Sequence, residues 1–125
     1  MFKESYPHMK FPLWVPRPAY ETLGIYAEWS ATYDADLTAA GYESPRRVAE
    51  AIRQFSIPDT TILDFGCGTG LSGQALQAVR FKHIDGVEIS PEMLTLAKKR
   101  NAYNSVWQCA LGKITDVKCG QYQVI

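Results

Sequence analysis

The chain has 125 residues, with 13 acidic and 13 basic side chains and therefore no formal net charge. Its hydrophobic content of 46% is enough to build a folded core, which excludes a chain that is disordered throughout. The length suits one domain, and the balanced charge provides no electrostatic footprint for nucleic acid or for an anionic membrane surface. We therefore expect neither of these partners.

The cysteines indicate a reducing environment. Cys67, Cys109 and Cys119 are an odd number at wide spacings, without a CxxC motif or a Cys/His cluster. We therefore expect free thiols, no disulfide framework and no metal site. No apolar run approaches the length of a membrane span, and the first residues lack the continuous apolar region of a signal peptide. Together these features predict a cytoplasmic protein.

The first part of the chain predicts an arm followed by helices. Residues 1–19 contain four of the seven prolines, which favours an extended arm, and residues 20–125 are expected to form the domain. Apolar spacing predicts a helix from Tyr20 to about Trp29, and a short helix that ends near Gly41.

A third helix is predicted by the stretch SPRRVAEAIRQF. Ser44 is expected to be its N-cap and Pro45 its first helical residue, because these residue types favour those positions. Its apolar residues are expected on one face and are Val48, Ala49, Ile52 and Phe55.

Strands and helices then alternate. The predicted strands are TTILDF, KHIDGVEI and SVWQCAL, and the predicted helices between them are LSGQALQAV and SPEMLTLAKKRN. Ser90 is the expected N-cap of the second helix, and Asn101 is expected to end it. QYQVI has the pattern of the first half of a fourth strand. Short connections in this order predict an α/β fold with a Rossmann-like, doubly wound and mostly parallel sheet.

The glycine-rich stretch ILDFGCGTG raises the question of a ligand site. Gly66, Gly68 and Gly70 follow directly on a strand and precede a helix. A helix N-terminus presents unpaired backbone N–H groups, and glycines let the chain bend sharply and let a ligand approach the backbone. This turn lies at the carboxyl end of a strand, where parallel α/β sheets bind ligands.

The glycine register and an acid distinguish two classes of ligand. The spacing G-x-G-x-x-G, typical of dinucleotide binders, occurs at Gly68, Gly70 and Gly73, but it begins two residues late for the strand end. The spacing that fits the strand end begins at Asp64 and continues through Gly66. A carboxylate there disfavours a pyrophosphate and suits an ammonium group, such as the amino-acid end of a sulfonium cofactor.

Glu88 is a second candidate ligand-binding residue. It ends the next predicted strand, 22 residues after Gly66, where a carboxylate can accept hydrogen bonds from both hydroxyls of a ribose. A solvated surface position is the alternative interpretation for an acid at a strand end. The combination with the glycine turn favours a nucleoside ligand.

These two motifs resemble those of the class I S-adenosylmethionine-dependent methyltransferases. ILDFGCGTG resembles the first motif of that family, and DGVEISPEML resembles the second. Residues 26–52 are also similar to the N-terminal segment of the Williams–Beuren-region methyltransferase-like proteins. The resemblance runs from Tyr20 to Ile125, and it covers the first half of the family's fold.

The resemblance implies S-adenosylmethionine as cofactor and S-adenosylhomocysteine as product. It implies that Asp64 lies near the ammonium group or a bound water, and that Gly66, Gly68 and Gly70 line the methionine part together with Cys67 between them. Glu88 would hold the ribose.

The resemblance also implies residues around the adenine and above the site. Ile89 and Met93 would form one wall against the adenine, although Met93 could equally be a helix core residue. The Tyr33–Asp34 pair would lie in a helix that closes over the cofactor, with Tyr26 nearby.

Two stretches depart from the family's pattern. Many members carry an acid at the end of the third strand, where this chain has Cys109, Ala110 and Leu111. Backbone groups or Gln108 would then hold the adenine. Gln123 stands where many relatives have an acid in the fourth strand.

The family's later strands have no counterpart here, so we expect a fragment or a truncated reading frame whose exposed sheet edge favours self-association.

Three functions follow from these patterns. The first is S-adenosylmethionine-dependent methyl transfer to an unidentified small-molecule or protein acceptor, with this chain supplying the cofactor-binding half. The second is a non-catalytic binding or interaction module, and the third is a nicotinamide oxidoreductase, which Asp64 disfavours. No residue is assigned a catalytic role, because Cys67 has no histidine partner in sequence and is expected to be a small packed residue.

Overall fold

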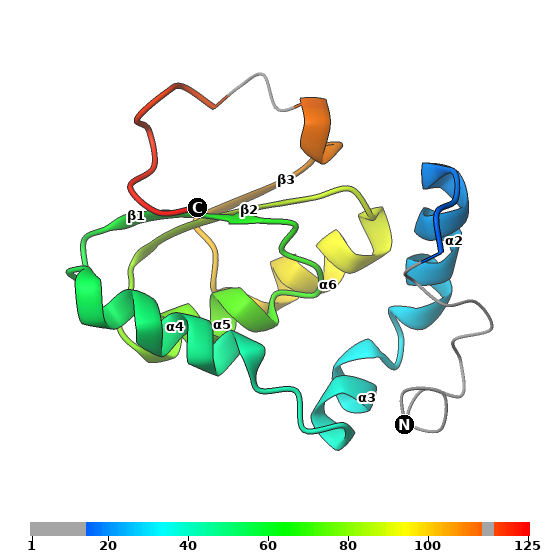
Figure 1. The fold of residues 1–125 in the computed structure, drawn as a ribbon, viewed down its shortest axis with the longest axis horizontal. Coiled ribbons are helices and arrows are strands. Elements are labelled where there is room, and N and C mark those ends of the chain that lie inside the picture. The colour runs from blue at the N-terminus through cyan, green and yellow to red at the C-terminus, as the bar shows by residue number, and fades with distance from the viewer. Residues whose placement is uncertain (1–14, 114–116) are drawn as a thin grey trace.

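The computed structural model describes residues 15–113 and 117–125, so most of the predicted arm lies outside the described residues. Three parallel strands form a sheet in the order β1-β2-β3. The strands are β1 (Thr61–Phe65), β2 (His83–Glu88) and β3 (Ser105–Gln108). The predicted parallel α/β fold is therefore confirmed (Figure 1).

Three α-helices pack on one face of this sheet (Figure 1). They are α4 (Ser44–Phe55), α5 (Leu71–Ala78) and α6 (Pro91–Arg100). The core of this layer consists of Ala49, Ile62, Leu76, Phe81 and Ile84. In the described part of the chain, the opposite face carries no α-helix; the segment after β3, with the short helix η1 (Leu111–Lys113), lies there instead.

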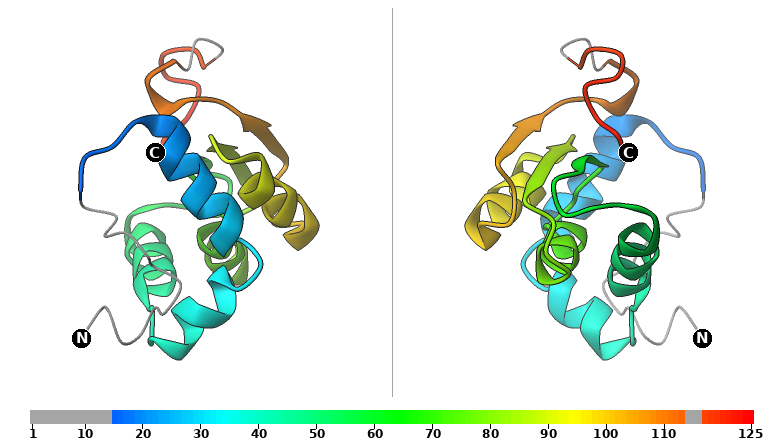
Figure 2. Two further views of the ribbon diagram at one scale, coloured as in Figure 1. Left: turned by 90° about the vertical axis from the view of Figure 1, so that its right-hand side faces the viewer. Right: turned by 90° about the vertical axis from the view of Figure 1, so that its left-hand side faces the viewer.

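Two further helices, α2 (Ala19–Trp29) and α3 (Tyr33–Ala39), stand beyond the carboxyl ends of the strands (Figures 1 and 2). They have a small core of their own, formed by Trp29 and Leu37, against which Leu71 at the start of α5 packs. We call this helix pair the roof. Because it stands at the ligand-binding end of a parallel sheet, it can cover a site formed there.

The residues expected to begin a fourth strand form a single bridge beside β1. Val124 pairs in parallel with Ile62, and the Leu63 amide donates to the Val124 carbonyl at 3.0 Å. β1 therefore lies between β2 and this C-terminal stretch. Part of the sheet edge at β1 is covered by the chain itself.

Helix α4 has the predicted extent, but its N-cap and the burial of its apolar residues differ from the prediction. Its N-cap is Glu43 and its first residue is Ser44, and no side chain provides a capping hydrogen bond. Ala49 is buried and Ile52 packs against the core, but Val48 is 51% exposed and Phe55 is 87% exposed. The apolar spacing predicted the helix correctly. Val48 and Phe55, however, are exposed and do not belong to the core to which Ala49 contributes.

Helix α6 has the predicted caps. The Ser90 hydroxyl accepts a hydrogen bond from the Met93 amide at 3.3 Å, and Asn101 ends the helix in the left-handed conformation with φ of +57°. These caps fix the start of α6 next to the end of β2. Within residues 15–113 and 117–125, no helix has the length and apolar character needed to cross a membrane.

Candidate functional site

The glycine-rich segment forms a tight turn between β1 and α5. Gly66, Gly68 and Gly70 have φ values of +82°, +55° and +93°, in the left-handed region that favours glycine. The amides of Gly66 and Cys67 both donate to the Val87 carbonyl, at 2.8 and 2.9 Å. The turn is thus anchored on β2, and its glycines are required by the backbone itself.

Glu88 connects this turn to the end of β2. Its Oε2 accepts a hydrogen bond from the Gly68 amide at 2.8 Å, and its Oε1 accepts from the amides of Ile89 and Ser90 at 2.9 and 3.0 Å. Glu88 is therefore not a solvated surface residue. Its carboxylate organises the backbone on both sides of the strand end.

A cavity of about 230 Å³ lies between the roof and the glycine turn. We call it the turn cavity. Its lining residues are Tyr26, Tyr33, Gly66, Gly68, Glu88, Ile89 and Met93. The structure therefore brings together six of the predicted site residues, and Tyr26, which was expected nearby, lies beside them. They come from α2, α3, the turn, the end of β2 and the first turn of α6, which are distant in sequence.

Aromatic side chains form the upper wall of the turn cavity. The rings of Trp29 and Tyr33 meet edge to face at 4.5 Å between centroids, and Tyr26 stacks beside Trp29 at 6.2 Å. Burial raises the pKa of Tyr26, and the negative charge of Glu88 raises it further. The Tyr26 phenol is therefore a neutral hydrogen-bond donor above an ionisable carboxyl group.

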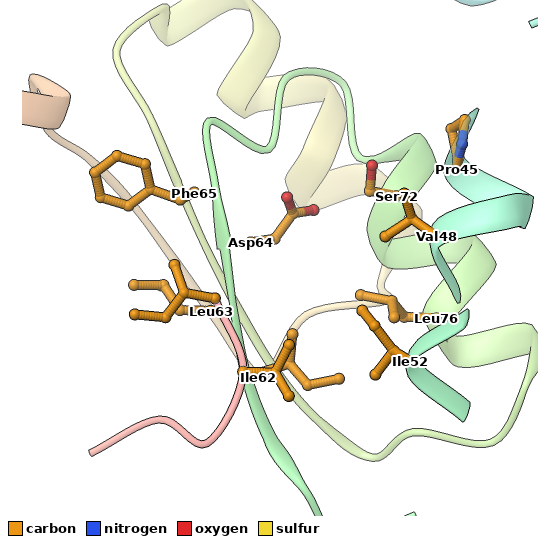
Figure 3. Close-up of a pocket in the computed structure, with 11 residues that line it drawn as sticks. Pro45, Val48, Ile52, Ile62, Leu63, Asp64, Phe65, Ser72 and Leu76 are labelled. Atoms are coloured by element: carbon orange, nitrogen blue, oxygen red, sulfur yellow. The ribbon is translucent and has the colours of Figure 1, made fainter. Parts of the chain in front are cut away.

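Asp64 lines a different cavity, of about 310 Å³, between β1, α4 and α5. We call it the edge cavity. Asp64 and Ser72 point their oxygen atoms into it, and Val48, Ile52 and neighbouring apolar residues border it (Figure 3). Asp64 Oδ2 accepts a hydrogen bond from the Tyr103 hydroxyl at 2.7 Å. Burial raises the pKa of Asp64, which the Tyr103 hydrogen bond partly offsets.

Cys67 and Gly70 are absent from the lining of the turn cavity. Cys67 is buried among Leu94, Ala97 and Tyr103, and burial raises the pKa of its thiol to about 12, with further contributions from nearby carboxylates. Such a thiol stays protonated at neutral pH and is a poor nucleophile. Gly70 is the N-cap of α5. Within residues 15–113 and 117–125, no cluster of three or more acidic, cysteine or histidine side chains could hold a metal.

Tyr103 is a central residue that sequence reasoning missed. Its hydroxyl accepts a hydrogen bond from the Gly73 amide at 3.1 Å while it donates to Asp64. A Cβ atom on Gly73 would lie 2.3 Å from Tyr103 Cζ, and one on Gly86 would lie 3.0 Å from the same ring. The third glycine of the G-x-G-x-x-G spacing therefore makes room for a tyrosine ring. Tyr103 stands in a loop without periodicity, so no sequence signal identified it.

Asp34 and Arg100 were missed as contacts of the turn. Thr69, between Gly68 and Gly70, donates its hydroxyl to Asp34, and its carbonyl accepts from Arg100 Nε at 2.6 Å. The sequence placed Asp34 in a helix near the site but did not identify its partners. Gln108, a candidate for holding adenine, donates its Nε2 to the Ile89 carbonyl at 3.1 Å.

The parallel α/β sheet, with a glycine turn and a carboxylate at adjacent strand ends, defines a Rossmann-like nucleotide-binding class of protein. A family described as "Methyltransferase domain" matches residues 62–124. The chain belongs to this family, within the class I S-adenosylmethionine-dependent methyltransferases, as its two motifs predicted.

Curated relatives and a solved structure agree with this membership. The chain is 34% identical over 97 residues to methyltransferase-like protein 27 of Homo sapiens, covering 74% of this chain and 39% of that protein. It is 27% identical over 86 residues to a ribosomal protein L11 methyltransferase of Clostridium perfringens, covering 67% of this chain and 28% of that protein. The structure of Streptomyces venezuelae DesVI matches with a TM-score of 0.54 and 27% identity, over 65% of this chain and 35% of that one.

Proposed function

We propose that this chain binds S-adenosylmethionine and provides the cofactor-binding part of a methyltransferase. One observation carries the proposal: Glu88 holds the glycine turn by the Gly68 amide and lines the same cavity as Ile89 and Met93. A carboxylate next to an apolar wall suits a nucleoside, whose ribose is polar and whose base is flat. The acceptor is a small molecule or a protein whose identity the described residues do not specify.

Glu88 can still accept a hydrogen bond from the ribose of a nucleoside in the turn cavity. A carboxylate has about four acceptor sites, and the backbone amides of Gly68, Ile89 and Ser90 use three of those on Glu88. Oε2 therefore has room for one ribose hydroxyl in this arrangement, rather than the two expected from the sequence. The other ribose hydroxyl would need a different partner, or the Gly68 amide would have to rotate away from Oε2.

The volume of the turn cavity also bears on the fit. At about 230 Å³ it is smaller than the roughly 300–1,000 Å³ typical of pockets that hold a whole drug-sized ligand. We therefore assign the nucleoside part of the cofactor to the turn cavity. The amino-acid part would extend over the glycine turn toward Asp64, whose second carboxylate oxygen has room for an ammonium group.

When bound, the cofactor supplies the electrophilic methyl group, and the protein contributes binding and orientation. Met93 and Ile89 would pack against the base, and Tyr26 and Tyr33 would exclude water from above. No side chain of this chain is proposed as a general base, and the raised pKa of Cys67 makes its thiol a poor nucleophile at neutral pH.

A non-catalytic binding module is the second candidate. It is compatible with the turn cavity, where no lining residue is proposed to act as a base or a nucleophile. The chain spans 39% of methyltransferase-like protein 27 and 28% of the L11 methyltransferase that it matches. Such a module would bind the cofactor without turning it over. Self-association through an exposed sheet edge and a reducing, cytoplasmic location remain proposals, the latter supported by the free thiols of Cys67, Cys109 and Cys119.

Isothermal titration calorimetry tests the proposal. We expect the purified chain to bind S-adenosylhomocysteine saturably and to show no heat with NAD, because the carboxylate of Asp64 at the strand end disfavours a pyrophosphate. Glu88→Ala should abolish binding, whereas Glu28→Gln, at an exposed position of α2, should leave it unchanged.

Binding of NAD with equal affinity, or no binding by a folded wild-type chain, would overturn the proposal. If the homologue binds, incubation with methyl-labelled S-adenosylmethionine and candidate acceptors distinguishes the two functions. Transfer of label supports a methyltransferase, and binding without transfer to any acceptor supports the module.

A further inference from the structure

Three elements meet at one arginine beside the turn cavity. Arg100, the last residue of α6, forms an ion pair with Asp34 of α3 through Nη2. Its Nε donates to the Thr69 carbonyl at 2.6 Å, and its Nη1 donates to Gln74 Oε1 of α5 at 2.7 Å. Thr69 completes the network by donating its hydroxyl to Asp34. Each nitrogen of the guanidinium thus contacts a different element.

This network is protected from solvent more than an ordinary surface ion pair. The Arg100 side chain is 17% exposed, the Asp34 side chain is 39% exposed, and Thr69 is 1% exposed. Partly buried charges are screened less by salt than exposed ones. The planar fork of arginine can make these three contacts together, whereas the single ammonium of lysine cannot reproduce their geometry.

The glycine turn is shaped to admit this side chain. A Cβ atom on Gly70 would lie 2.8 Å from Arg100 Cδ, so the aliphatic stem of the arginine occupies the space beside the glycine. Gly70 does not line the turn cavity, and its left-handed backbone and this close approach together account for its place in the motif.

The position of the network connects the two walls of the turn cavity. Asp34 follows Tyr33, which lines the cavity from the roof, and Thr69 follows Gly68, which lines it from the turn. Apolar packing of Leu71 against the Trp29–Leu37 core also holds the roof, but it is not directional. The polar network therefore fixes the height and orientation of the roof above the turn.

We propose that Arg100 is a positioning residue that latches α3 onto the glycine turn and thereby keeps the turn cavity covered. Asp34 is its partner on the roof, and Thr69 is its partner on the turn. The latch itself rests on the contacts above. Its effect on a bound nucleoside rests on the proposed function.

Hydrogen exchange read by mass spectrometry tests the latch without any ligand. In Arg100→Met and in Asp34→Asn, we expect amides of residues 19–39 to exchange about tenfold faster, the effect expected when a charge-assisted hydrogen bond is lost. Amides of β1 and β2 should keep their wild-type rates. Arg100→Lys should fall between wild type and Arg100→Met, because it keeps only the charge.

Lys99→Met is the matched control, because Lys99 is an exposed cation in the same helical turn. It should leave exchange in the roof unchanged. Faster exchange spread evenly over the chain in Asp34→Asn would show a general loss of stability, and unchanged exchange would show no latch. Either result overturns the proposal, and Asp34→Asn keeps it testable if Arg100→Met does not fold.

Dissociation of S-adenosylhomocysteine, measured by stopped-flow displacement, tests the consequence. We expect the dissociation rate to rise about tenfold in Asp34→Asn and Arg100→Met, as exchange in the roof does. If exchange changes while dissociation does not, the latch exists but does not cover the ligand. If the wild-type chain binds no homologue, the proposed function fails, and the exchange result still decides whether the latch exists.

Discussion

At the scale of single residues, the motif glycines have different structural reasons. Gly66 and Gly68 line the turn cavity, Gly70 admits Arg100, and Gly73 admits the Tyr103 ring. A sequence pattern cannot separate these roles, because the partners come from distant parts of the chain. The glycine turn was thus predictable, whereas Tyr103 and Arg100 were not.

Gly73→Ala should destabilise the protein by about 1–3 kcal/mol, because its Cβ would overlap the buried Tyr103 ring. Gly24→Ala is the matched control, since no atom lies within 4 Å of a Cβ built there and Gly24 stands inside α2. It should stabilise by about 0.5–1 kcal/mol. Urea unfolding followed by circular dichroism measures both, and equal effects of the two substitutions would contradict the account of Gly73.

Asp64→Asn should make the fold more stable at pH 7, because burial raises the pKa of Asp64 and the ionised form is therefore unfavourable in the folded state. The stabilising contribution of the protonated form is complete below the ordinary pKa of 3.8 and is lost as pH rises through the folded-state pKa. The advantage of the variant should therefore shrink as pH falls toward 4. Urea unfolding of both chains at several pH values measures it.

Glu28→Gln, at an exposed carboxylate of α2, is the control and should show no such gain. A pH-independent difference between Asp64→Asn and the wild type would contradict the assignment of a raised pKa to this residue. Loss of stability in Asp64→Asn at pH 7 would contradict it too.

Cys67 should resist alkylation, because a pKa of about 12 leaves about one thiol in 10,000 ionised at pH 8. Cys119 is exposed and should react much faster with iodoacetamide. Peptide mapping of the folded chain after timed labelling compares the two rates. Cys119→Ser should remove the fast label, and labelling of Cys67 at the rate of Cys119 would contradict its burial.

At the scale of elements, order and type were predictable from local patterns. Ser90 and Asn101 are the N-cap and the C-cap of α6, as expected, because capping depends on residues adjacent to the helix. The orientation of α4 was predictable only in part. Ala49 and Ile52 meet the core, but the exposure of Phe55 depends on which neighbours the helix meets.

Ser44 and Ser90 look alike in sequence, since each is followed by proline, but only the Ser90 side chain caps a helix. Ser90→Ala should cost about 0.5–2 kcal/mol, because it leaves the Met93 amide without its acceptor in a fully buried position. Ser44→Ala should be nearly neutral, since Ser44 lies inside α4 and the helix has no side-chain capping bond. Thermal unfolding of both variants compares them, and equal costs would contradict the assigned N-caps.

At the scale of the whole molecule, the roof and the strand ends make one site from segments far apart in sequence. Glu88 and the glycines were predictable from their spacing to a strand end, whereas Met93 was expected only from the family resemblance. The Asp34–Arg100 pair and the separation of Asp64 from Glu88 into two cavities depend on packing that local patterns do not contain. The family's motifs therefore predict the ligand class better than the contacts around it.

The central claim is that the nucleoside part of S-adenosylhomocysteine occupies the turn cavity. We would titrate the ¹⁵N- and methyl-labelled chain with this ligand and follow its NMR chemical shifts. We predict the largest changes at the amides of Gly66, Gly68 and Ile89 and at the Met93 methyl group, and smaller ones near Val48 and Ile52 in the edge cavity. Changes centred on the edge cavity, or none at saturating ligand, would contradict it.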